Sequence, residues 1–375
     1  MLSFNPSTTI LTMLKDLQGR LVEAYKGLEH VSATEKQYLN KCALISNVGA
    51  STRIENAVLT DVEIEWVDTT LSKDGKTTAF EEKKEYILDK LSKDRERSVE
   101  EVVGCRNVLN TIYLQAVEFQ PLTEIVIRGL HHDLLKHYPS AVRYAGMYKI
   151  AFNRVVAKDH QSGEERVVLE PTEPGVMTNI AMQELVEWYN ITIKEYQWPL
   201  MVAIEFMFRF LAIHPFQDGN GRLGRALFLL ILLQSGDKYL QEVVPYISVD
   251  RHIEQNKSQY YTVLHQCSDG KFSTDPAKYK YEPLTMFFLK IFEKAVLDVE
   301  IYHERYADFQ QLPESAYKVL DSFKSSPEKR LKVSDIEAMT ELPRRTIQFA
   351  LKTLVDKQFI QGLGKGAGSR YQLIF

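Results

Sequence analysis

The twelve residues from His214 to Arg225 constrain this chain more than any other stretch. Their sequence, HPFQDGNGRLGR, places a titratable base, a carboxylate, a glycine-rich turn and two guanidinium groups in one short segment. A helical apolar pattern precedes it over Met201–Ile213, and an unbroken apolar run, Ala226–Leu233, follows it. Polar groups between two buried helices cost free energy unless they are paired or bind a ligand. The stretch therefore predicts a ligand site in a short loop between two buried helices.

Length and composition are typical of a globular protein. They do not indicate that the chain spans a membrane or that the whole molecule binds a polyanion. The 375 residues allow about two or three domains, and 45% hydrophobic and 26% charged residues are ordinary values. The net charge is -4. The longest apolar run is far shorter than the roughly 20 residues that span a bilayer. Because the three cysteines show no disulfide or zinc spacing and no signal peptide is evident, we expect a cytoplasmic protein.

Helical periodicity dominates the first three hundred or so residues. The polar stretch Asp68–Asp94 interrupts it, and we expect a loop there that runs into a solvated helix. The clearest helical segments are Ile10–Leu28, Val99–Phe119, Thr123–His137 and Val176–Trp188.

A β-hairpin is predicted within this helical region. Val155 and Val156 begin a short apolar run, a polar turn containing Gly163 follows, and Arg166–Leu169 forms the second strand. A lone hairpin in a helical domain usually acts locally, for example by holding a peptide through strand addition.

Beyond a boundary near Gln310–Pro313 the pattern indicates three short helices and a closing hairpin, which is the winged-helix order. Nine lysine and arginine residues against four acidic ones follow from Lys329 onward, a surplus that fits nucleic-acid contact. A protein–protein or dimerisation module with a basic solvated face is the interpretation we favour, since a winged helix alone does not imply DNA binding. The helices are expected at Ala316–Ser325, Val333–Glu341 and Pro343–Lys357, and the hairpin at Phe359–Ile360 and Tyr371–Phe375, joined by Gly362, Gly364, Gly366 and Gly368.

The central glycines favour an anion-binding turn rather than the dinucleotide-binding fingerprint. Gly219–Gly224 matches GxGxxG, but that fingerprint should follow a strand, whereas a helix precedes it here. Glycines at 219 and 221 let backbone N–H groups converge at the positive end of the next helix. Arg222 and Arg225, three residues apart, project to one side of that helix and can each grip phosphate oxygens.

Two further side chains extend this anion site to catalysis. Asp218 offers a hard oxygen ligand that suits Mg²⁺ bound to phosphates. His214 can be a neutral base at cellular pH. Together with the anion site they predict phosphoryl or nucleotidyl transfer, in which positioning and charge stabilisation supply most of the catalysis.

The segment His214–Arg225 also resembles the HPFx(D/E)GNGRxxR signature of Fic-domain proteins. The resemblance implies an all-α helical domain with a β-hairpin flap, and a protein adenylyltransferase that moves AMP from ATP to a Ser, Thr or Tyr hydroxyl of a target protein. It implies His214 as the base that deprotonates the hydroxyl and Asp218 as the Mg²⁺ ligand. The implied ATP contacts are Gly219, Asn220, Gly221 and Arg222 at the α- and β-phosphates and Arg225 at the γ-phosphate.

Other segments extend the resemblance over about residues 40–300. Gly146–Lys149 resembles the segment that leads into the family's flap, with Lys149 where arginine is more usual. The hairpin at Val155 and Val156 would then be the flap that docks the target backbone. Tyr260 and Tyr261 resemble the family's adenine-side helix, although helix packing alone would also account for them.

The segment Ser51–Asn56 resembles the (S/T)xxxE(G/N) inhibitory motif found ahead of some Fic domains. Ser51 and Glu55 are four residues apart and fall on one face of a helix. In the family this glutamate pairs with the second arginine of the signature, here Arg225, and excludes the γ-phosphate. A carboxylate in the guanidinium fork would explain this exclusion physically.

The chain is thus expected to hold a helical N-terminal region (1–115), a Fic catalytic domain (116–310) and a winged-helix domain (311–375). The predicted activity is ATP- and Mg²⁺-dependent adenylylation of a target protein, inhibited by Glu55. Two alternatives stay open: removal of AMP from a modified protein, and a DNA-binding regulator or scaffold that retains a Fic pocket. A homodimer and DNA contact through the C-terminal domain also stay open.

Overall fold

The computed structural model describes residues 1–72, 79–91, 95–158, 165–325, 329–364 and 368–374. These residues form two compact units. The first combines residues 1–57 with 100–300, and the second combines residues 58–99 with 301–375.

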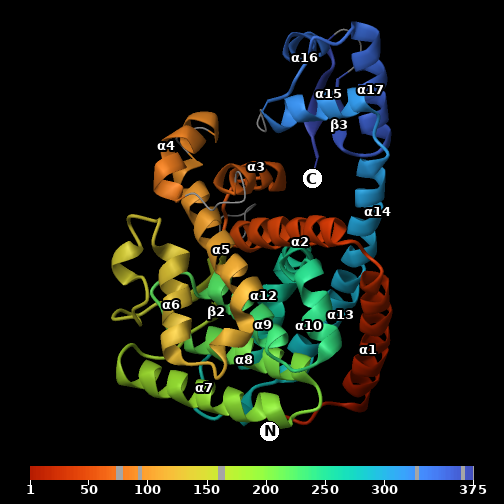
Figure 1. The fold of residues 1–375 in the computed structure, drawn as a ribbon. Coiled ribbons are helices and arrows are strands. Elements are labelled where there is room, and N and C mark those ends of the chain that lie inside the picture. Colours follow the sequence, from red (N-terminus) through yellow and green to blue (C-terminus); the bar gives the residue numbers. More distant parts are fainter. Residues whose placement is uncertain (73–78, 92–94, 159–164, 326–328, 365–367, 375) are drawn as a thin grey trace. The chain divides into compact units, whose positions relative to one another are not determined.

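Two buried helices form the centre of the first unit. Every residue of α8 (Pro199–Ile213) is buried, and so is nearly all of α9 (Asn220–Leu233), which packs against it. A helix that is apolar on all sides must be covered on all sides. α7 (Val176–Glu195) and α13 (Tyr281–Val296) provide part of that cover on α8 (Figure 1). The buried position of α8 and α9 fixes the turn between them, which carries residues 214–219 of the signature.

The remaining helices of this unit surround that pair. α2 buries almost every residue from Cys42 to Thr52 and packs against α11. Its N-cap is Ser32, whose side chain accepts from the backbone N–H of Glu35, and its C-cap is Glu55. The bounds are α1 (Thr8–Glu29), α2 (Ala33–Ile54), α6 (Glu124–Leu135), α10 (Lys238–Val243), α11 (Val249–Gln255) and α12 (Lys257–Ser268), with η3 (Ala116–Phe119), η4 (Val142–Tyr144), η5 (Val244–Tyr246) and η6 (Pro276–Lys278).

The hairpin predicted near residues 155–169 is present. β1 (Val155–Lys158) pairs antiparallel with β2 (Glu165–Leu169), with a bulge between Val155 and Val156. β2 packs on α12. The predicted turn with Gly163 lies outside the described residues.

The second unit begins with α3 (Asp61–Leu71) and α4 (Phe80–Leu91). The expectation of a loop and a solvated helix over Asp68–Asp94 is wrong in two respects. The start of that stretch belongs to α3, and α4 buries Phe80, Ile87, Leu88 and Leu91. The apolar residues of α4 are few, but they recur on one face, and the charged residues between them obscured this pattern. Residues 73–78 and 92–94 lie outside the described part. α5 (Glu96–Gln115) and α14 (Asp298–Gln310) carry the chain from one unit to the other.

The C-terminal part of the second unit has the element order expected from its sequence. α15 (Glu314–Lys324), α16 (Val333–Thr340) and α17 (Arg344–Asp356) are followed by the antiparallel strands β3 (Ile360–Leu363) and β4 (Arg370–Leu373). Leu331 pairs with Tyr371 of β4 through backbone hydrogen bonds. Gly366 lies outside the described residues.

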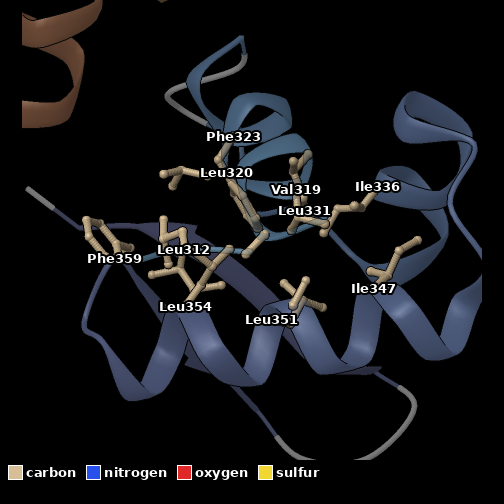
Figure 2. Close-up of a cluster of buried hydrophobic side chains, with 13 residues drawn as sticks. Leu312, Val319, Leu320, Phe323, Leu331, Ile336, Ile347, Leu351, Leu354 and Phe359 are labelled. Atoms are coloured by element: carbon tan, nitrogen blue, oxygen red, sulfur yellow. The ribbon is translucent and has the colours of Figure 1, made fainter. Parts of the chain in front are cut away.

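One hydrophobic core holds these three helices and the hairpin together. Figure 2 shows side chains from all three helices and from the start of the hairpin meeting in a single cluster. Its labelled members are Leu312, Val319, Leu320, Phe323, Leu331, Ile336, Ile347, Leu351, Leu354 and Phe359.

The all-α fold class predicted from the sequence is confirmed, with β1–β2 and β3–β4 as the hairpins of the described chain. Among the described helices, none is both long enough and apolar enough to cross a membrane.

The C-terminal core yields a stability prediction. Leu351→Ala removes a buried side chain from α17, so we expect the free energy of unfolding of the second unit to fall by roughly 2–5 kcal/mol. Phe349→Ala changes a side chain on the same helix that is 64% exposed, and we expect a change within about 0.5 kcal/mol. Urea unfolding followed by hydrogen exchange of residues 312–360 measures both. Equal losses in the two variants would contradict this core.

Candidate active site

The turn between α8 and α9 has an unusual backbone. His214 ends α8 in the left-handed region, at φ 51° and ψ 59°, and its N–H still donates to the carbonyl of Phe210 at 2.9 Å. Gly219 is the N-cap of α9, with φ 79°. A left-handed conformation costs a non-glycine residue of order 1–3 kcal/mol, and it persists only when neighbouring contacts impose it. Those contacts come from Asn220, His131 and the segment 148–153.

Asn220 closes the turn with both ends of its amide. Its Oδ1 accepts from the N–H of Phe216 at 2.9 Å, and its Nδ2 donates to the carbonyl of the same residue at 2.7 Å. The side chain is buried. With both ends of the amide held at Phe216, the backbone N–H of Asn220 at the start of α9 is a group that it can offer to a phosphate.

His131 of α6 supports the same turn and was not identified from the sequence. Its Nδ1 accepts from the N–H of Gly146, and its Nε2 lies 2.9 Å from the carbonyl of Asp218. This pairing requires the proton on Nε2. The ring also stacks on Phe216 with centroids 3.7 Å apart. Burial lowers the pKa of His131 to about 4, so the imidazole is neutral at neutral pH.

A cavity of about 310 Å³ opens above this turn, at the lower end of the size range of small-molecule sites. It gathers residues from five separate parts of the sequence. Every residue proposed for the site lines it except Ser51, which is buried: Glu55, Val155, Val156, His214, Asp218, Gly219, Asn220, Gly221, Arg222, Arg225, Tyr260 and Tyr261.

Arg222 is a buried cation with unused donors. Its Nε and Nη1 have no hydrogen-bond partner among the described residues. Its Nη2 lies 3.4 Å from Asp218 Oδ1, and Nη1 lies 3.8 Å from Glu101 Oε1. Unsatisfied donors on a buried guanidinium are costly, so they indicate a place that an anion can fill. The adjacent N-terminus of α9 favours the same sign of ligand.

Arg225 is also buried, but its donors are occupied. Nε donates to Ser51 Oγ at 3.1 Å, and Nη2 donates to the carbonyl of Ser51 at 2.9 Å and to Glu55 Oε1 at 3.0 Å. Burial opposes the charge, but the carboxylates of Glu55 and Asp250 outweigh it and raise the pKa of Arg225. The pair Ser51 and Glu55, read from the sequence as one motif, thus meets Arg225 from the end of α2.

The two carboxylates next to Arg225 differ in exposure. Asp250 of α11 is buried, and its Oδ2 lies 3.7 Å from Arg225 Nε. The Glu55 side chain is 33% exposed and faces the cavity. A side chain built on Gly221 would collide with the Glu55 carboxylate. Glu55 is therefore the counter-ion that can leave, and Gly221 gives it the space to approach.

The imidazole of His214 is held neutral. Burial lowers its pKa to about 4, and the positive charge of Lys149 acts in the same direction. Nδ1 is buried, and a hydrogen bond with the backbone of Leu211 opposes part of this shift. A neutral imidazole at the floor of a cavity can accept a proton from a bound hydroxyl.

Asp218 has the properties of a shared Mg²⁺ ligand. Its side chain is 43% exposed and lines the cavity beside Arg222. No group of three or more His, Cys, Asp or Glu side chains suited to a metal occurs in the part of the chain that the structure describes. Mg²⁺ at phosphate sites needs only one or two carboxylates, because phosphates and water complete its shell. The residues present therefore fit a metal that arrives with a phosphate ligand.

The two tyrosines occupy different positions in the cavity wall. Tyr260 is buried and contacts the rings of Phe287 and Phe288 at centroid distances of 6.0 and 6.4 Å. Tyr261 lies beside it, at 5.5 Å between centroids. Most of the Tyr260 ring is used in packing between helices. Tyr260 and Tyr261 both line the same cavity as the hairpin residues Val155 and Val156.

Several contributors escaped prediction from the sequence. They are single residues far from the signature: His131, Asp250, Glu101 and Asn153. None belongs to a local pattern, so only the fold brings them to the site. The sequence offered one signal. A buried arginine needs carboxylate partners, but this rule does not identify the carboxylates.

Comparison with known proteins agrees with this geometry. Residues 121–232 match the family model described as Fic/DOC family. The chain carries a Fic/DOC family domain. Two curated relatives are the proteins named "Protein adenylyltransferase Fic" of Drosophila mojavensis and Drosophila willistoni, which are 32% and 30% identical over 100 residues. Each match covers 27% of this chain and 18% of the relative, so this chain spans less than a fifth of the length of these relatives.

Solved structures share the fold. A Fic family protein from Desulfovibrio desulfuricans matches with a TM-score of 0.56 and 19% identity, over 100% of this chain and 98% of that one. A Fic domain containing signaling protein from Bacteroides thetaiotaomicron has the same TM-score and 22% identity, over 78% of this chain and 98% of that one. Fic-1 from C. elegans matches with a TM-score of 0.55 and 16% identity, over 79% of this chain and 73% of that one.

The pKa of His131 gives a pH prediction. Its folded value of about 4 lies below the ordinary 6.5, so the unfolded chain binds more protons between these values, and stability is lost as the pH falls through that window. From pH 7 to pH 5 we expect His131 to account for a loss of about 2 kcal/mol in the free energy of unfolding.

Urea titrations at the two pH values measure this loss. His131→Asn should reduce the loss by about this amount and leave the share of His214, whose pKa is also about 4, whereas His132→Asn, a change at the exposed neighbour, should leave the pH dependence as in the wild type. An unchanged slope in His131→Asn would contradict a buried neutral His131.

Proposed function

We propose that this chain is a protein adenylyltransferase that transfers AMP from ATP to a hydroxyl of a target protein and is inhibited by Glu55. The observation that carries the proposal is the buried guanidinium of Arg222, with unused donors, at the N-terminus of α9 and beside a neutral His214. The name of the curated relatives, protein adenylyltransferase Fic, supports the same activity. The three described cysteines are free thiols, which agrees with a cytoplasmic location.

In this mechanism the hydroxyl oxygen of the target attacks the α-phosphorus of ATP, and the bond to pyrophosphate breaks. His214 accepts the proton of the hydroxyl, because its neutral ring has a free lone pair at the cavity floor. Arg222 and the first N–H groups of α9 would hold the α- and β-phosphates, and Arg225 would hold the γ-phosphate. Asp218 would hold Mg²⁺, which supplies charge neutralisation at the phosphates when bound.

The target would bind along the β1–β2 hairpin. Val156 is exposed and lines the cavity together with Val155. A two-stranded hairpin offers free backbone groups on its outer edges, so an extended target segment can add to it as a further strand.

Glu55 would act as the inhibitor by occupying Arg225. The 3.0 Å hydrogen bond from Arg225 Nη2 to Glu55 Oε1 uses the donor that the γ-phosphate needs. The partial exposure of Glu55 supports its release, whereas Asp250 and Ser51 keep Arg225 in place.

The test is labelling of target proteins with ATP carrying a labelled α-phosphate. Glu55→Gly should raise labelling at least about 10-fold, because a charge-assisted hydrogen bond to a buried guanidinium contributes roughly 1.5–3 kcal/mol. His214→Ala should abolish labelling in both backgrounds. The assay uses the full chain, Mg²⁺ and a cell lysate as the source of targets.

Matched variants separate charge from shape. Glu55→Gln keeps the side chain's size and loses its charge, so it should raise labelling less than Glu55→Gly does. No rise in either folded variant sinks the inhibitory role. Glu55-dependent loss of AMP from a pre-labelled target would instead assign the chain to AMP removal.

We propose a second function for the C-terminal part of the second unit, contact with double-stranded DNA through α17. Arg345, Gln348, Phe349 and Lys352 recur at helical spacing, and all four are exposed. Arginine, glutamine and lysine read base edges and phosphates in the major groove, and an apolar ring can contact thymine methyl groups. This spacing supports a winged-helix role for residues 311–375.

Gel-shift titration of the full chain with duplex DNA at two salt concentrations tests this contact. Arg345→Ala with Lys352→Ala should weaken binding and lower its salt dependence. Lys318→Ala, an exposed lysine on α15, serves as the control and should bind as the wild type does. Binding that is absent, or equal in all variants, would exclude the contact.

A further inference from the structure

Both ends of the β1–β2 hairpin are hydrogen-bonded to the turn that carries His214. Asn153 lies two residues before β1, and Thr172 lies three residues after β2. From these two positions, and from Lys149, the four consecutive carbonyls of residues 213–216 all receive hydrogen bonds. This row of carbonyls, which we name the 213–216 row, spans the left-handed residue His214.

Asn153 contacts two members of the 213–216 row. Its Nδ2 donates to the carbonyl of Phe216 at 2.8 Å and, more weakly, to the carbonyl of His214 at 3.4 Å. The residue also lines the cavity. Since the carbonyl of His214 belongs to the peptide unit next to its left-handed backbone, Asn153 acts on the group that sets the direction of the imidazole.

Lys149 fixes the orientation of the Asn153 amide. Its Nζ donates to Asn153 Oδ1 and to the carbonyl of Ile213, both at 3.1 Å, and its backbone N–H donates to the carbonyl of Pro215 at 2.7 Å. The side chain is buried, and burial lowers the pKa of Lys149 to about 8. An ammonium facing Oδ1 leaves the Nδ2 end of the amide directed at the 213–216 row.

Thr172 makes the corresponding contact from the other end of the hairpin. Its hydroxyl donates to the carbonyl of Ile213 at 2.9 Å and pairs with the hydroxyl of Thr178 at 2.8 Å. Both threonines are buried. The hydroxyl of Thr178 also lies 2.6 Å from the carbonyl of Glu173, so two hydroxyl protons serve three contacts. Thr172 donates to Ile213 in the arrangement in which Thr178 donates to Thr172.

We propose that Asn153 and Thr172 are positioning residues that tie the β1–β2 hairpin to the 213–216 row, so that a target segment held by the hairpin also fixes the imidazole of His214. The proposal rests on the proposed transferase function for its catalytic consequence. The structural tie itself stands on the hydrogen bonds alone.

The tie predicts a separation of kcat from the KM for ATP. In Asn153→Ala, tested in the Glu55→Gly background, kcat for target labelling should fall on the order of 10-fold. The reason is that even a small displacement of a catalytic base from its productive position lowers the rate. The KM for ATP should stay within about twofold, since His131 and Asn220 still hold the residues at the start of α9. A KM that rises as much as kcat falls would overturn the proposal.

Thr172 offers a matched pair of variants. Thr172→Val keeps the shape and removes the hydroxyl, whereas Thr172→Ser keeps the hydroxyl. We expect kcat to fall several-fold in Thr172→Val and to return to within about twofold of the parent in Thr172→Ser. Equal kcat values in the two variants would overturn the role of the hydroxyl.

Hydrogen exchange tests the tie without any activity. In the full chain without nucleotide, Asn153→Ala should speed amide exchange in residues 148–153 and 213–219, while exchange within α8 and α9 stays as in the parent. Unchanged exchange in both segments, or faster exchange throughout the first unit, would overturn the tie. If no variant labels any target, the transferase assignment fails, and the exchange result still decides the structural tie.

Discussion

A buried guanidinium needs negative charge and acceptors around it, and Arg225 imposes this requirement on the first unit. It joins α9, which carries it, to the C-terminal end of α2 through Ser51 and Glu55 and to α11 through Asp250. Removing one partner of a buried ion pair is far more costly than never burying the pair. The buried charge therefore holds three helices in register around the cavity.

Two costly local features lie at the cavity. Arg222, which lines it, has a buried guanidinium with two nitrogens that lack a hydrogen-bond partner among the described residues, and His214, which also lines it, has a positive φ. Each feature lowers stability and would be removed by selection for stability alone. The buried helices α8 and α9 supply enough apolar contact to hold the strained turn in place.

Prediction from the sequence succeeded where a local pattern carried the information. The periodicity of residues 10–28 and 176–188 predicted helices, two short apolar runs around a polar turn after Val155 predicted a hairpin, and the signature brought His214 to Arg225 into one site. It failed for α4, whose few apolar residues are separated by charges. It could not find His131 or Asp250, because the need for a partner is local but the partner's place in the chain depends on the tertiary fold. Glu55 is an intermediate case. A short sequence motif identified the glutamate, and the tertiary fold brought it to Arg225.

The absence of a side chain at position 221 bears on both the proposed inhibition and the proposed chemistry of this protein. Glycine there admits the carboxylate of Glu55, and in the proposed mechanism it would also admit a phosphate, so the same space would serve two ligands that exclude each other. A lineage that lost Glu55 would keep only one of the two constraints on this position. Drift at residue 221 among descendants should therefore follow, rather than precede, the loss of the glutamate, and the order of these substitutions would record whether regulation or chemistry was abandoned first.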